Sequence, residues 1–166
     1  MPGSGKSSVG RSLAEMLGCS FIDTDILIQN KNDTTLEAVV NSLGTEAFLN
    51  IERDVCCSLD VINTVIATGG SVVYRERSMK HLSRIGTIVY LKVGLEKLNA
   101  RLIDMKQRGV VFKKGQTLDD IYNERIPLYE KYADIIINED TLGFNDTVLS
   151  VYYEIKQYNK RITIIS

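Results

Sequence analysis

The residues with the clearest chemical potential form one short run. Gly3-Ser4-Gly5-Lys6-Ser7 is the downstream half of the phosphate-binding motif G-x-x-x-x-G-K-[ST]. Glycines let the backbone wrap so that its N–H groups point at phosphate oxygens, and a helix that begins at Lys6 directs its positive end to the same anion. The Lys6 ammonium would reach the outer phosphates, and the Ser7 hydroxyl would be placed for Mg²⁺. A Gly/Ser linker is the alternative.

A pair of carboxylates comes next. Asp23 and Asp25 stand at the end of a strand predicted at 20–23, the edge where ligands bind in open parallel sheets. We expect Asp23 to hold Mg²⁺, directly or through water, and Asp25 to position or deprotonate a substrate hydroxyl. The alternative is a helix N-cap, where Asp is favoured. The phosphate motif just upstream favours the functional interpretation.

Two further segments could contact a substrate. Gly69 and Gly70 follow a strand predicted at 64–67, and glycines there allow a ligand to approach the backbone closely, although a plain tight turn explains them equally well. Residues 106–115 are basic and contain two glycines. Such a stretch is typical of a lid, here about 105–117, that would bring Arg108 to a transferring phosphoryl group. A solvated surface loop is the alternative.

The elements that must position these residues alternate along the chain. Hydrophobic periodicity predicts helices at 5–17, 35–42, 45–59, 76–83, 94–105, 117–132 and 145–158, and strands at 20–23, 64–67, 87–91, 134–138 and 161–165. Alternating strands and helices indicate an α/β fold with a parallel sheet of five strands.

The strand at 161–165 has a particular expected position. A phosphate loop normally follows a buried strand, and no such strand precedes Met1 in this sequence. Read tail to head, the apolar run at 161–165 supplies that strand, and Ser166 takes the first position of the motif. We therefore expect this strand at the centre of the sheet, in a circularly permuted order. An edge strand, or a strand exchanged with a second copy, are the alternatives.

Composition limits the possible classes of protein. The chain has 166 residues, 44% of them hydrophobic and 25% charged, and a net charge of −1. These values predict one domain over 1–166 and give no reason to expect nucleic acid as a partner. No apolar run approaches the ~20 residues of a membrane span, and no secretory signal is seen. The three cysteines have no metal-ligand spacing. We expect a cytoplasmic monomer.

The order of motifs resembles shikimate kinase, within the nucleoside-monophosphate-kinase-like branch of P-loop kinases. The resemblance covers nearly the whole chain, and it rests on these matching pieces: Gly-Ser-Gly-Lys-Ser at 3–7, Gly10-Arg11, Asp23-Thr24-Asp25, Phe48 with Glu52, Ala67-Thr68-Gly69-Gly70, Arg108, and Glu124-Arg125 with Pro127-Leu128-Tyr129. It implies a three-layer α/β/α kinase fold.

The same resemblance implies transfer of the γ-phosphoryl group of ATP to a ring hydroxyl of shikimate or of another hydroxylated metabolite. The implied roles are ATP binding by Gly3, Ser4, Gly5, Lys6, Ser7, Ser8 and Arg101; Mg²⁺ binding by Ser7 and Asp23; acceptor binding by Asp25, Gly69, Gly70 and Arg125; and catalysis by Lys6, Asp25 and Arg108.

The sequence departs from the family pattern at the acceptor site. Leu49 stands where the family has an arginine that binds the substrate carboxylate, and Ser71 replaces a third glycine. Arg53 lies four residues after Leu49 and would share its helix face, so it is a candidate replacement. The alternative function is therefore a nucleotide-binding protein of the same fold with lost or altered acceptor specificity.

Overall fold

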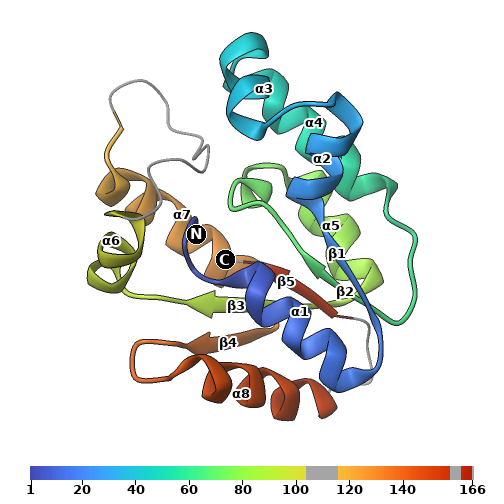
Figure 1. Cartoon of the computed structure of the whole chain (residues 1–166), viewed down its shortest axis with the longest axis vertical. Helices are drawn as coiled ribbons and strands as arrows, with labels where there is room; N and C mark the ends of the chain where they lie inside the picture. The colour runs from blue at the N-terminus through green and yellow to red at the C-terminus, as the bar shows by residue number, and fades with distance from the viewer. Residues whose placement is uncertain (104–115, 158–161, 166) are drawn as a thin grey trace.

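The computed structural model describes residues 1–103, 116–157 and 162–165, and its centre is a parallel sheet (Figure 1). The strands are β1 Ser20–Asp23, β2 Thr64–Ala67, β3 Thr87–Lys92, β4 Ile135–Asn138 and β5 Ile162–Ile165. Their order across the five-stranded sheet is β1-β2-β5-β3-β4. Strand β5 pairs with both neighbours, since Ile162 is in register with Val65 of β2 and with Thr87 of β3.

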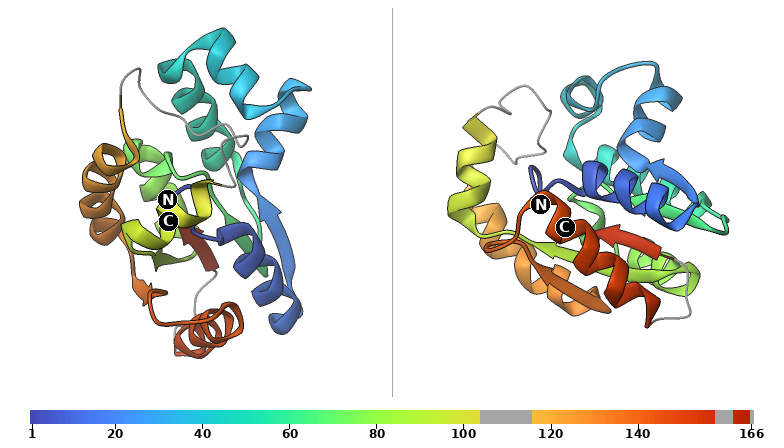
Figure 2. Two further views of the ribbon diagram at one scale, coloured as in Figure 1. Left: turned by 60° about the vertical axis from the view of Figure 1, so that its left-hand side comes forward. Right: turned by 60° about the horizontal axis from the view of Figure 1, so that its bottom comes forward.

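Helices cover both faces of the sheet (Figure 2). Their bounds are α1 Lys6–Leu17, α2 Thr24–Asn32, α3 Leu36–Leu43, α4 Thr45–Ser58, a 3-10 turn η1 Val72–Tyr74, α5 Glu76–Ile85, α6 Leu95–Ile103, α7 Leu118–Tyr132 and α8 Phe144–Lys156. Adjacent strand residues point to opposite faces of a sheet, and here both faces are apolar. One face packs on α1 and α8, and the other packs on α5 and α7.

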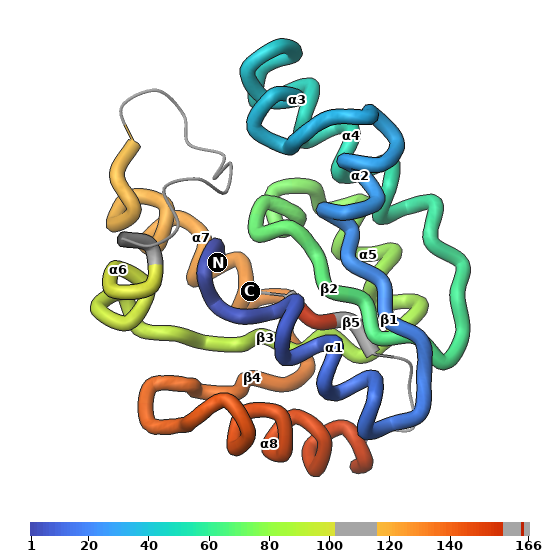
Figure 3. Tube along the Cα trace, viewed as in Figure 1, coloured from blue at the N-terminus to red at the C-terminus, as the bar shows by residue number. Residues whose placement is uncertain are grey.

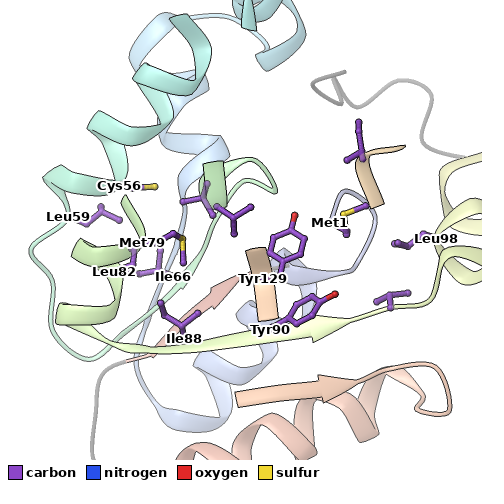
Figure 4. Close-up of a cluster of buried hydrophobic side chains, with 14 residues drawn as sticks. Met1, Cys56, Leu59, Ile66, Met79, Leu82, Ile88, Tyr90, Leu98 and Tyr129 are labelled. Carbon is purple, nitrogen blue, oxygen red and sulfur yellow. The ribbon is translucent and has the colours of Figure 1, made fainter. Parts of the chain in front are cut away.

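The face that carries α5 and α7 holds two fully buried tyrosines, Tyr90 and Tyr129 (Figure 4). Tyr90 of β3 stacks on Tyr129 of α7, with ring centroids 5.1 Å apart, while Met79 and Leu82 of α5 are fully buried beside Ile66 of β2. The three-layer α/β/α arrangement is thus built from strands that are apolar on both sides, as parallel strands covered by helices usually are.

Helices α2, α3 and α4 form a separate cluster beside the ends of β1 and β2 (Figure 3). Its small core contains Ile28, Val39, Phe48, Leu49 and Val55. The sequence did not predict α2, because its segment has only one fully buried apolar residue, Ile28. Asp23 begins this helix: its Oδ1 accepts a hydrogen bond from the Asp25 N–H at 3.0 Å.

The tail strand, predicted at 161–165, lies between β2 and β3 and is described over 162–165. Arg161, Ser166 and the segment 104–115, which holds Arg108 and most of the predicted lid, lie outside the described residues. Among the helices of the described residues, none is long and apolar enough to cross a bilayer.

Candidate active site

The phosphate loop forms a tight curl ahead of α1. Gly3 and Gly5 have φ angles of 77° and 90°, in the left-handed region that costs glycine little. Gly5 is the N-cap of α1, so the helix dipole points into the loop. The Lys6 ammonium lies inside the curl, where it donates to the Met1 carbonyl at 2.8 Å and contacts Ser4 Oγ at 3.4 Å. Burial lowers the pKa of Lys6, and the Asp25 and Asp23 carboxylates oppose that shift.

Ser7 and Asp23 meet beside this loop. The Ser7 hydroxyl donates to Asp23 Oδ2 at 2.6 Å, across the gap between α1 and the end of β1. The two residues offer hard oxygen ligands, which suit Mg²⁺, an ion that is usually held by one or two carboxylates together with substrate phosphates. No cluster of three or more His, Cys, Asp or Glu that could hold a metal occurs in the part of the chain that the structure describes. The Ser7–Asp23 pair fits a metal that is also held by phosphate oxygens of a substrate.

Asp25 lies next to a second, fully buried carboxylate, Glu52. A Cβ placed on Gly69 would lie 2.8 Å from Asp25 Oδ1 and would overlap Glu52 Oε1, so the missing side chain of Gly69 makes room for both. Asp25 Oδ1 and Glu52 Oε1 are buried and have no hydrogen-bond partner among the described residues. Glu52 is held from its other side by Ser71 Oγ, which donates to Oε2 at 2.8 Å.

The protonation of the two carboxyl groups follows from this environment. Burial raises the pKa of Asp25 to about 6, while the nearby Lys6 ammonium opposes the shift. Burial also raises the pKa of Glu52 to about 8, and the charge of Asp25 adds to it. The pKa of Glu52 thus lies above that of Asp25, so Asp25 is the carboxyl that loses its proton first as the pH rises. The ionised Asp25 oxygen can accept a proton from a hydroxyl that enters the space at Gly69.

Gly70 connects this pair to Arg125. Tyr129 Oη donates to the Gly70 carbonyl at 2.6 Å, which fixes the turn. Arg125 is 3% exposed, and its Nε donates to Tyr74 Oη at 3.1 Å. The Arg125 guanidinium also lies 5.0 Å from the centroid of the Tyr74 ring, and a Cβ on Gly70 would lie 3.2 Å from it. The structure therefore brings together the four residues that were predicted to bind the acceptor, which are Asp25, Gly69, Gly70 and Arg125.

Two cavities flank these residues. One, of ≈ 160 Å³, is lined by Thr45, Glu46, Leu49, Tyr74, Arg75, Gln116 and Arg125. The other, of ≈ 340 Å³, is lined by Gly3, Ser4, Gly5, Ser8, Val9, Arg101, Glu139, Leu142, Gly143, Phe144 and Thr147. The larger cavity opens on the phosphate loop, and the smaller one opens beyond Arg125.

Arg101, predicted to bind ATP, lies in the wall of the larger cavity. It donates to the Gly3 carbonyl at 3.1 Å and forms an ion pair with Glu139 at 3.4 Å. Phe144 stands at the start of α8 in the same wall and is 50% exposed. No sequence pattern pointed to Phe144 or Glu139, because both lie at a loop edge where only the folded chain brings them near the glycines.

Two expectations for the acceptor side need correction or extension. Arg53 is not a replacement for the family arginine, since it bonds to Asn50 at 2.9 Å and Asp54 at 2.8 Å and does not line the smaller cavity. Glu52 was not predicted as a site residue. The sequence did contain a sign of its role, because Glu52 shares a helix face with the apolar residues Phe48 and Val55. A carboxylate on the buried face of a helix indicates a functional or structural partner.

The fold and these sites define the class of protein. A parallel sheet with a phosphate loop ahead of α1, a metal-compatible Ser–Asp pair and a buried carboxylate at the turn after β2 is the arrangement of a small-molecule kinase. The chain belongs to the shikimate kinase family: the model of that family, described as "Shikimate kinase", matches residues 2–155.

Individual relatives agree with this membership. The chain is 33% identical over 164 residues to the shikimate kinase of Clostridium botulinum (strain Loch Maree / Type A3), covering 96% of this chain and 93% of the relative. It is 36% identical over 146 residues to that of Paracidovorax citrulli, covering 84% and 79%. A solved structure, "Shikimate kinase from Acinetobacter baumannii in complex with shikimate", matches with a TM-score of 0.84 and 29% identity, covering 95% of this chain and 89% of that one.

Proposed function

We propose that this chain transfers the γ-phosphoryl group of ATP to a hydroxyl of a small hydroxylated metabolite, and that shikimate is the first acceptor to test. One observation carries the proposal: Asp25, Lys6 and the Gly69–Gly70 turn meet at one edge of the sheet, beside the phosphate loop. The choice of shikimate is supported by the similar Acinetobacter baumannii structure, which is a complex with that molecule.

The phosphates of ATP would lie in the loop of Gly3, Ser4, Gly5, Lys6, Ser7 and Ser8, with the nucleobase in the larger cavity against Arg101 and Phe144. Entry of the phosphates would replace the contact of the Lys6 ammonium with the Met1 carbonyl. The ammonium would then offset the charge that develops on the transferred group. An exposed aromatic ring and a guanidinium plane are suitable partners for stacking on a base.

Ser7 and Asp23 would hold Mg²⁺, directly or through water. When bound, the metal supplies charge that neutralises the phosphate oxygens during transfer. Without the metal, the Ser7 hydroxyl donates a hydrogen bond to the Asp23 carboxylate. Binding of the metal would replace this hydrogen bond.

In the transfer step, Asp25 accepts the proton of the acceptor hydroxyl. The hydroxyl oxygen forms a bond to the γ-phosphorus while the bond between that phosphorus and the β–γ bridging oxygen breaks. The products are a phosphate monoester, ADP and the proton held by Asp25. Arg125 and the Gly69–Gly70 turn would hold the acceptor. Arg108, outside the described residues, is proposed to reach the transferred group as part of a lid at about 105–117.

The direct test is a phosphotransfer assay with ATP, Mg²⁺ and a panel of hydroxylated acids and neutral polyols. The proposal predicts that ADP forms only when a suitable acceptor is present, in equal amount to a new phosphate monoester. ADP formation that is independent of every acceptor would contradict it.

A second candidate function is a nucleotide-binding protein with lost or altered acceptor specificity. Leu49 favours it, because this apolar side chain lines the acceptor-side cavity where the family resemblance places an arginine. Binding of ATP without transfer to any acceptor in the panel would be the expected result for that function.

We further propose that β5 serves as the strand that leads toward the phosphate loop, which makes the element order a circular permutation of the family's. The support is local: β5 lies between β2 and β3, and Ile164 Cδ1 would be 3.6 Å from a Cβ on Gly10 of α1. A variant in which residues 158–166 precede Met1 should keep its affinity for ATP; a loss of that affinity would oppose this arrangement.

A single monomeric domain over 1–166, active in the cytoplasm, stays a prediction.

A further inference from the structure

Arg75 is the second guanidinium in the smaller cavity. It follows η1 directly and lies in the same wall as Arg125 and Leu49. Arginine keeps its charge at all physiological pH values and presents a planar fork that matches a carboxylate. Within the described lining, two arginines and one glutamate give a net charge of +1. The cavity is therefore suited to an anionic group.

Arg75 is only partly satisfied by the protein. One terminal nitrogen forms an ion pair with Glu46 Oε2 at 2.6 Å. The Nε atom of Arg75 is buried and has no hydrogen-bond partner among the described residues. A buried donor without a partner costs free energy, which a suitable acceptor atom would recover.

Glu46 can be released at small cost. Its side chain is 79% exposed, while that of Arg75 is 25% exposed. Ion pairs with one well-hydrated partner contribute little to stability. A carboxylate that enters the cavity can thus take the place of the Glu46 carboxylate on Arg75 without a large penalty, and it can use Nε as well.

We propose that Arg75 binds the carboxylate of the acceptor, with Glu46 as an internal stand-in that the substrate displaces. This inference rests on the proposed function and narrows the acceptor to a hydroxy acid. The order of residues along the site agrees with this proposal, because Arg125 lies next to Gly70 and Asp25 lies next to Gly69. The hydroxyl would face Asp25 while the carboxylate faces Arg75. Arg75 would thus supply the charge that Leu49 cannot.

The test compares Arg75→Gln with Arg77→Gln, an exposed arginine at the start of α5 that does not line the cavity. For shikimate, R75Q should raise the acceptor KM by about tenfold or more, as expected for the loss of a charge-assisted hydrogen bond, while the ATP KM stays within about twofold. R77Q should leave both unchanged. The methyl ester of shikimate should not distinguish R75Q from the wild type.

Glu46→Gln provides an independent arm. If Glu46 competes with the substrate, E46Q lowers the KM for shikimate, and this gain disappears in the R75Q background. Arg75→Lys keeps the charge and should recover part of the affinity for shikimate. It replaces R75Q in the comparison if R75Q unfolds below the assay temperature. Equal KM values for R75Q and R77Q, or an equal loss for shikimate and its ester, would overturn the inference.

Failure of the proposed function gives a different result. If the wild type phosphorylates only acceptors without a carboxylate, the kinase assignment stands and the role of Arg75 is wrong. If it phosphorylates nothing, calorimetric titration of shikimate into the wild type and R75Q decides: tighter binding by the wild type supports the Arg75 site, and equal or absent binding rejects it.

Discussion

At the scale of single residues, the site depends on charges placed close together in a buried space. Asp25 and Glu52 lie at the Gly69 turn, and Lys6 lies in the phosphate loop. Burial lowers the pKa of Lys6 and raises those of the two carboxyl groups, so it favours the neutral form of each. Groups with perturbed pKa values are concentrated at the active sites of enzymes. The roles of these residues can be separated by substitution.

Lys6→Ala should lower phosphoryl transfer by about 10²-fold or more, since it removes fixed positive charge from the transferred group. The fold should remain, because the hydrogen bonds that the ammonium makes among the described residues stay within its own loop. Lys80→Ala, on the surface of α5, is the matched control. Product formation and circular dichroism are the measurements; near wild-type turnover in K6A would rule out the phosphate-loop assignment.

Asp25→Asn should lower kcat by about 10²–10⁴-fold and leave ATP affinity nearly unchanged, as expected for a base that acts on the acceptor. Because the base must be ionised and its pKa is raised to about 6, kcat/KM of the wild type should fall as the pH drops through that value. The residual activity of D25N should lack this acid limb. An equal loss of ATP affinity would instead mark Asp25 as a metal or structural residue.

Gly69→Ala should impair the acceptor site more than Gly70→Ala. A methyl group at Gly69 overlaps the buried Glu52 carboxylate, whereas one at Gly70 lies 3.2 Å or more from its neighbours. We expect G69A to raise the acceptor KM and lower kcat together, with ATP affinity kept. Equal kinetics for the two variants would show that the space at Gly69 is not used by the acceptor.

At the scale of elements, the helix that carries Glu52 links stability to pH. The pKa of Glu52 is raised from 4.5 to about 8 in the folded protein, so the folded state binds this proton more tightly than the unfolded state does. Its contribution to stability is complete below pH 4.5 and is lost as the pH rises toward 8. Asp25, whose pKa is also raised, acts in the same direction over a narrower range.

Glu52→Gln should therefore flatten the pH dependence of the free energy of unfolding. The wild type should lose stability between about pH 5 and pH 8, and E52Q should lose less, because glutamine has no proton to release. Urea denaturation at several pH values measures this. Parallel curves for the two proteins would mean that Glu52 is ionised in the folded state.

Some elements could be predicted from sequence and others could not. Helix α1 and β3 were found because one has a clear apolar stripe and the other a continuous apolar run. Helix α2 was not, since its residues after Asp23 are mostly polar and Ile26 is 44% exposed. The same limit applies to the site: Lys6 and Asp25 belong to local motifs, whereas Arg75 and Phe144 become candidates only through distant packing.

At the scale of the whole molecule, β5 joins the two halves of the sheet. It pairs with β2 on one side and β3 on the other, and Thr68 donates to the Ile164 carbonyl at 3.3 Å just before the Gly69 turn. The α/β class followed from the alternation of strands and helices. The position of β5 could be argued only from the phosphate motif, since strand order is not encoded in local periodicity.

Deletion of residues 161–166 should abolish folding or nucleotide binding, because it leaves β2 and β3 without a common neighbour. Removal of Ser166 alone, which keeps every paired residue of β5, is the control. Circular dichroism and ATP titration report the outcome. A protein truncated at residue 160 that binds ATP normally would show that β5 is dispensable for the phosphate site.

In the proposed reaction Lys6 stabilises the transferred phosphoryl group, while Asp25 and the two arginines of the acceptor side act on one hydroxy acid. Phosphorus NMR of a reaction containing the wild type, ATP, Mg²⁺ and shikimate tests it most directly. A new phosphate monoester signal should grow in step with ADP and be absent with D25N. Appearance of inorganic phosphate with ADP, and no monoester with any hydroxy acid, would contradict the account.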